Sequence, residues 1–224
     1  MKKIGALLLA AMLSFGAANA VVPSKAEAFD WFGVAARAVV ASQQKAAIVE
    51  SLEYYDGEGR DELMQELKQQ NGVNYDATAN AMLESIMTNI TAGIAKTEPT
   101  ITEKPYRYFV NNDQSFNAFC ALGHNVSVNI GAFEFVNYNE AKLAAIIAHE
   151  LVHGQRDHSL KGAKKKLSVD VVMASIGGEL GVGSIIAANV VAVHAKNSGI
   201  TKKNEWEADN ISFDYMSAAG YNVG

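Results

Sequence analysis

Apolar positions repeat at helical spacing over most of the chain. Residues 29–55 are rich in alanine and carry apolar positions three or four apart, and a Gly-Glu-Gly stretch ends this pattern. Further helices are predicted at residues 61–69 and 76–95, the second with Asp76 as its N-cap. The expected buried face of that second helix consists of Ala81, Ile86, Ile90 and Ile94.

Strand patterns occupy only a short central part of the chain. Two strands are expected, at residues 106–111 and 117–130. In the second, Val126, Val128 and Ile130 alternate with polar residues, as in a half-buried strand. Helical patterns follow to the end, so the sequence predicts an α+β fold that is mostly helical with a small sheet. We expect a helical segment at 21–72 and the main domain at 73–224.

The N-terminus has the pattern of a secretory signal peptide. Lys2 and Lys3 precede an apolar stretch, and Ala18-Asn19-Ala20 is a small-x-small site, so cleavage is expected after Ala20. Cleavage at a second such site, residues 26–28, is an alternative, and an uncleaved anchor is disfavoured because the apolar stretch is short for a membrane span. The mature protein is therefore expected to be exported and periplasmic.

Charge, cysteine content and one long apolar segment bear on which classes of function and location are possible. Without Lys2 and Lys3, 17 of the 19 basic residues remain against 24 acidic ones, which disfavours nucleic-acid binding. The single Cys120 cannot form an internal disulfide and is expected to be a buried thiol. The apolar segment 167–193 is interrupted by Asp170 and Glu179, so a buried helical hairpin is favoured over a membrane span. Peripheral membrane contact stays open as an alternative.

The pentapeptide His149-Glu150-Leu151-Val152-His153 carries the clearest chemical signal. Its surroundings predict a helix, capped by Asn139 or Asn137, that places the two imidazoles on one face. Both could then bind one metal ion while Glu150 reaches a water molecule on that ion. This arrangement is typical of metal-assisted peptide hydrolysis.

A third ligand is expected downstream, where Glu205 and Asp209 share a helical face. Glu205 could bind the metal while Asp209 accepts the N–H of a ligating histidine. The alternative is a solvated acidic helix start, favoured by the helix dipole. Glu207 is expected on another face and outside the site.

The other histidines are expected to be ordinary structural residues. His158 is interpreted as a capping or surface residue and His194 as a charge partner at a helix C-terminus. His124 is interpreted as a loop residue near the expected substrate edge.

The combination of HELVH, EWEAD and the upstream residues Asn117-Ala118-Phe119 resembles the HtpX and CAAX prenyl endopeptidase family of gluzincin metallopeptidases. More narrowly, it is similar to the soluble exported bacterial members that act in envelope protein quality control. The similarity extends over about residues 75–224, and SFNAFCALGHNVSVNIGAFEFV resembles the edge strand of the family and the strand after it. A Ser-Arg pair usual in the family reads Thr201-Lys202 here. The later His, Arg or Tyr that assists the transition state in relatives has no match.

The resemblance implies a role for each matching residue. It places the ligands of one zinc ion per chain at His149, His153 and Glu205, the general base at Glu150, and the supporting carboxylate at Asp209.

The sequence thus predicts a zinc endopeptidase in which the edge strand around Asn117 and Ala118 binds protein substrates in extended form. Such recognition is weakly sequence-selective, which suits unfolded or misassembled envelope proteins. The alternative is a metal-binding periplasmic chaperone or adaptor with weak or regulated proteolysis. A helical scaffold with accidental histidine spacing is the third reading. The oligomeric state is not predicted.

Overall fold

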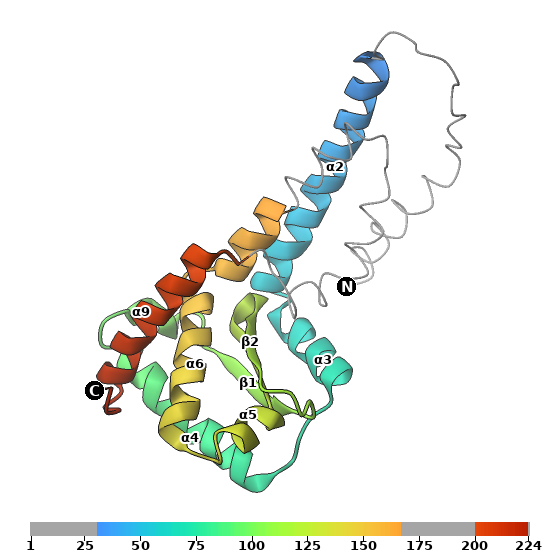
Figure 1. Cartoon of the computed structure of the whole chain (residues 1–224). Helices are drawn as coiled ribbons and strands as arrows, with labels where there is room; N and C mark the ends of the chain where they lie inside the picture. Colours follow the sequence, from blue (N-terminus) through green and yellow to red (C-terminus); the bar gives the residue numbers. More distant parts are fainter. Residues whose placement is uncertain (1–30, 167–199, 224) are drawn as a thin grey trace.

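Helices dominate the computed structural model, which describes residues 31–166 and 200–223 (Figure 1). Residues 158–166 are helical. The other elements, in chain order, are α2 (Trp31–Asp56), α3 (Arg60–Asn71), α4 (Ala77–Ile94), the 3-10 turn η1 (Pro99–Thr102), β1 (Arg107–Asn111), β2 (Ala118–Ala121), the 3-10 turn η2 (Leu122–His124), β3 (Asn125–Asn129), α5 (Ile130–Phe135), α6 (Glu140–Gln155) and α9 (Lys202–Ala218). The predicted α+β class with a small sheet is confirmed.

The sheet has three strands in the order β1-β3-β2. β1 is parallel to β3, and β2 is antiparallel to β3 and forms an edge. The prediction of one strand over 117–130 was wrong, because η2 turns the chain at Gly123, where a φ of 72° favours glycine.

The central strand β3 is buried along its whole length, so the expected half-buried strand is not found. Its polar residues are accommodated by hydrogen bonds. Asn111 Nδ2 donates to Ser127 Oγ at 2.8 Å and to Asn129 Oδ1 at 2.7 Å. The alternation of polar and apolar residues in β3 therefore reflects a buried hydrogen-bond network and not the exposure of one face to water.

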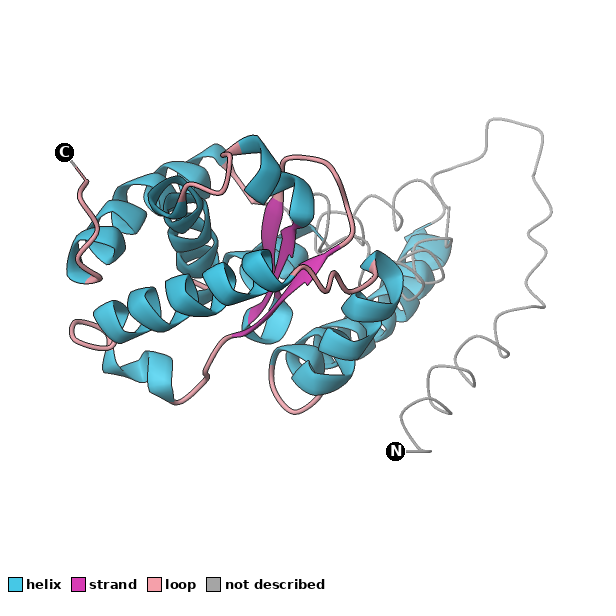
Figure 2. Cartoon of the chain, turned by 90° about the horizontal axis from the view of Figure 1, so that it is seen from below, coloured by secondary structure: helices cyan, strands magenta, loops and turns pink. Residues whose placement is uncertain are grey.

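Each face of the sheet is covered by its own apolar cluster. Val110, Val126 and Val128 pack with α4, α6 and α9 on one face. Phe109 and Leu122 pack with α2 and α3 on the other. Figure 2 shows the strands between these two groups of helices. One face of the sheet therefore packs against α6, and the edge strand β2 lies next to that helix.

The helix starts follow local capping chemistry. The Asp76 side chain accepts from Ala79 N at 2.7 Å at the start of α4, as predicted. Asn139 does the same for Lys142 N at 3.1 Å at the start of α6. Ala81 was wrongly assigned to the buried face of α4 and is exposed, and Leu83 is buried there instead.

The C-terminal helix α9 lies along α6 (Figure 1) and crosses α4 very closely. A methyl group added at Gly93 would lie 2.7 Å from the backbone nitrogen of Ala219. Lys96 Nζ also donates to the Ala218 carbonyl at the end of α9, at 3.3 Å. The end of α9 is thus fixed against α4.

Three sequence interpretations fall outside the described residues. These are the signal peptide at 1–20, the apolar segment at 167–193 and His194. Within 31–166 and 200–223, no helix combines the length and the apolar character that crossing a bilayer requires.

Candidate metal centre

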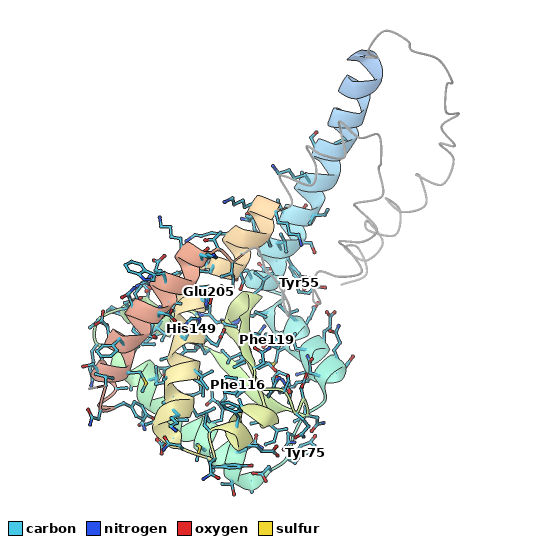
Figure 3. The ribbon with its side chains drawn as sticks, in the orientation of Figure 1. Tyr55, Tyr75, Phe116, Phe119, His149 and Glu205 are labelled. Carbon is cyan, nitrogen blue, oxygen red and sulfur yellow. The ribbon has the colours of Figure 1, made fainter. Side chains whose placement is uncertain are left out.

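The α6 and α9 helices bring the three predicted ligands together. His149 Nε2 and His153 Nε2 lie 3.0 Å apart on α6. Glu205 on α9 places Oε2 3.4 Å from His149 Nε2 and Oε1 3.7 Å from His153 Nε2. Figure 3 shows His149 and Glu205 side by side on the two helices.

These separations fit a small metal ion. Tetrahedral zinc with bonds of about 2.0–2.1 Å keeps its ligand atoms about 3.3 Å apart. The three side chains offer two imidazole nitrogens and a carboxylate oxygen, all within 4.8 Å of one another. This donor set is the one that catalytic zinc sites of the His-His-Glu type use, so the residues fit the metal.

His149 is supported from α9 by a carboxylate. Asp209 Oδ1 lies 3.0 Å from His149 Nδ1, on the ring nitrogen that faces away from Glu205. The Asp209 side chain is 70% exposed, whereas that of His149 is 22% exposed. Because residues four apart lie on the same face of a helix, the carboxylates of Glu205 and Asp209 both reach the imidazole of His149.

Glu150 directs its carboxylate at the edge strand β2. Cys120 N donates to Glu150 Oε2 at 3.1 Å. Desolvation raises the pKa of the Glu150 carboxyl to about 8, although the Cys120 N–H lowers it. A carboxylate with a raised pKa accepts a proton more readily than a solvated one does.

The free edge of β2 begins at Ala118. Asn129 N donates to the Asn117 carbonyl at 3.1 Å, so Asn117 faces β3. In an antiparallel ladder the orientation alternates, and residues 118 and 120 direct their backbone groups away from β3. Cys120 uses both of its groups, since Ser159 Oγ donates to its carbonyl at 3.0 Å. Of the two predicted substrate residues, Ala118 faces the edge and Asn117 does not.

His158 is not a capping or surface residue, and that prediction was wrong. Its side chain is 3% exposed, and its Nδ1 lies 3.0 Å from Nδ1 of His153. Its other ring nitrogen lies 3.5 Å from Glu207 Oε2. Glu207 is not among the three grouped side chains, but it contacts His158, which in turn contacts His153. Helical spacing did not reveal His158, because Asp157 takes a φ of 51° and interrupts the helix before it.

The remaining candidates are structural. His124 is 7% exposed, stacks on Tyr106 and places Nδ1 2.7 Å from the Lys104 carbonyl. Burial lowers its pKa, and it is held inside the molecule rather than in an open loop. Cys120 is buried as predicted, and burial raises the pKa of its thiol far above the usual range, which makes it a poor nucleophile.

Comparison with known proteins gives consistent results. Residues 76–224 match Peptidase family M48. The beta-barrel assembly-enhancing protease of Escherichia coli (strain K12) is 28% identical over 130 residues, covering 52% of this chain and 26% of that protein. Metalloprotease LoiP of the same organism is 29% identical over 147 residues, covering 64% of this chain and 56% of that protein.

Metalloprotease YcaL of Escherichia coli (strain K12) is 28% identical over 123 residues, covering 54% of this chain and 48% of that protein. The chain thus spans between about a quarter and just over half of the length of these relatives. The family match covers more than half of the chain, so the resemblance inferred from HELVH and EWEAD is confirmed and the chain belongs to peptidase family M48, a family of metallopeptidases.

Proposed function

We propose that the protein is a zinc endopeptidase that hydrolyses peptide bonds of unfolded or misassembled cell-envelope proteins. The observation that carries the proposal is the convergence of His149, His153 and Glu205 at separations of 3.0–3.7 Å. Glu150 lies on the same helix between the two histidines. Family membership and three relatives that are named as proteases support the same activity.

Each residue of the centre has a defined task in this proposal. His149, His153 and Glu205 hold one zinc ion per chain, which when bound supplies a Lewis acid and acidifies a water molecule. Glu150 takes up the proton of the attacking water at its carboxylate and returns it to the leaving amine. Asp209 keeps the His149 ring in the orientation that ligation requires.

The edge of β2 provides the substrate contact. A peptide added beside Ala118 would pair with its backbone groups and would lie near Glu150, which already contacts the next outward residue, Cys120. Backbone pairing selects an extended conformation rather than a sequence, and unfolded proteins offer it. Export after cleavage at Ala20 would place this activity in the periplasm.

The test is zinc content by mass spectrometry combined with casein cleavage. Wild type and Glu150→Gln should each carry about one zinc per chain. Cleavage by Glu150→Gln should fall by about 10²–10⁴-fold, because the variant can bind substrate but cannot move the proton. Glu134→Gln is the control, since this exposed carboxyl lies outside the site.

Three outcomes would count against the proposal. Absence of zinc in the wild type would contradict the metal centre, and equal cleavage by wild type and Glu150→Gln would contradict the role of Glu150. Casein binding without cleavage by the wild type would favour the chaperone or adaptor alternative.

A further inference from the structure

We propose that His158 and Glu207 form a relay that orients His153 and sets which of its ring nitrogens carries the proton. The inference rests on the proposed metal centre, because the relay matters only if His153 Nε2 is a ligand. His153 and His158 are 2% and 3% exposed. Water therefore does not satisfy their facing nitrogens, and the two rings must satisfy each other.

The geometry leaves one consistent arrangement of protons. To bind a metal through Nε2, His153 must carry its proton on Nδ1. That N–H points at His158 Nδ1, 3.0 Å away, which must then accept. The His158 proton is consequently on Nε2, which faces Glu207 Oε2 at 3.5 Å. The chain of donors thus starts at the metal-facing imidazole and ends on a carboxylate, which favours the proton pattern that ligation requires.

The end of the relay is held in place by a cation. Arg156 Nε lies 3.9 Å from Glu207 Oε1. The same guanidinium donates twice to Glu98, at 2.8 Å each, and Tyr215 OH donates to that carboxylate at 3.0 Å. Glu207 is therefore positioned between a fixed guanidinium and His158, although its own side chain is 38% exposed.

The relay also joins two distant parts of the sequence. His158 follows α6, whereas Glu207 belongs to α9, which comes after residues 167–199 in the sequence. Glu205 and Glu207 therefore act on the centre together when α9 lies against α6. The first supplies a ligand, and the second completes the support of a ligand from the other helix.

The experiment measures zinc affinity by competition with a chelator in four full-length variants. His158→Ala should bind zinc about 10–100-fold more weakly. His158→Gln should recover most of this loss, because its amide oxygen can accept from His153 Nδ1–H. Glu207→Gln should weaken binding severalfold. Asp214→Asn, which removes an exposed carboxyl from the same helix, should match the wild type.

A second readout needs no metal. In metal-free protein, ¹⁵N NMR should find the proton of His153 on Nδ1, and His158→Ala should move a measurable fraction of it to Nε2. A residue that only fills space would not change this tautomer ratio.

The relay and the proposed function can fail separately. If the wild type binds no zinc, the proposed function fails, and an unchanged tautomer ratio in His158→Ala would also overturn the relay. If the wild type binds zinc, equal affinity in His158→Ala, or no recovery in His158→Gln, overturns the relay alone. Should His158→Ala fail to fold, as judged by circular dichroism, Glu207→Gln decides, and unchanged zinc affinity in that variant overturns the relay.

Discussion

Each of the two histidines of the candidate centre has one partner at its Nδ1, a carboxylate at the surface for His149 and a buried imidazole for His153. His149 pairs with Asp209, whose side chain is 70% exposed, and we call these two residues the exposed arm. His153 pairs with His158, whose side chain is 3% exposed, and we call these two the buried arm. If a supporting residue near the surface is removed, water can take over its hydrogen bond, whereas inside the molecule the partner is left without one.

The electrostatic consequences differ as well. Desolvation, together with His149 and His158, lowers the pKa of His153 to about 3. The buried imidazole therefore stays neutral and available as a ligand over the physiological range. Asp209, by contrast, interacts with His149 through a solvated carboxylate, so added salt should screen this contact.

The largest effect is expected for the ligand that the two arms share. Glu205 contacts both His149 and His153, so Glu205→Ala should lose most of the bound zinc, with affinity at least about 100-fold lower. Mass spectrometry of the purified variant measures the loss, with Asp214→Asn as the control. Full zinc occupancy in Glu205→Ala would show that the arms do not share this ligand.

Removing the support of the exposed arm should have a smaller effect. Asp209→Asn should weaken zinc binding by roughly tenfold, the lower end of the range for such supporting groups, because the amide still accepts a hydrogen bond. The difference from wild type should shrink in high salt, whereas the effect of His158→Ala should not. Chelator competition at two salt concentrations measures both. A loss in Asp209→Asn that is larger than in His158→Ala would reverse the comparison.

The last effect is expected on folding stability rather than on zinc affinity, and it concerns the pair of Glu98 and Arg156, whose guanidinium also lies near Glu207. Hydrogen bonds from Arg156 lower the pKa of the Glu98 carboxyl below its ordinary value of 4.5. The unfolded chain therefore binds a proton more readily, so this pair stabilises the protein above pH 4.5 and loses its contribution as the pH falls below that value.

Glu98→Gln should lower the free energy of unfolding by about 1–2 kcal/mol at pH 7 and should flatten the pH dependence below 4.5. Urea unfolding of metal-free protein at several pH values measures both quantities. An unchanged slope below pH 4.5 in Glu98→Gln would remove Glu98 from the account of acid sensitivity.

The contrast between the arms also explains what the sequence could predict. His149, His153, Glu205 and Asp209 come in pairs four residues apart, and this local spacing survives folding unchanged. His158 lies beyond a turn with a positive φ at Asp157, where no helical rule applies. Its role depends on a contact with another part of the chain, and the spacing of residues along the sequence does not predict such a contact.

The fold shows the same division. Caps at Asp76 and Asn139 were predicted because they are local chemistry. The turn at η2 was missed because it lies in an apolar stretch, residues 117–130, that reads as one continuous strand. The six-residue helix α5 begins at Ile130, where that predicted strand was expected to end. Only burial of both faces of β3 distinguishes that stretch from a half-buried strand.

The close approach of α4 at Gly93 to the end of α9 bears on where α9 can lie. A helix advances about 1.5 Å per residue, so a slip of one residue would displace Glu205 by about 1.5 Å. That displacement exceeds the whole spread among the three ligand separations, which run from 3.0 to 3.7 Å. A Cβ at position 93 would lie 2.7 Å from the backbone nitrogen of Ala219, so a larger residue there would push the end of α9 away from α4. A glycine remote from the candidate centre thus allows the close packing that positions the helix carrying Glu205.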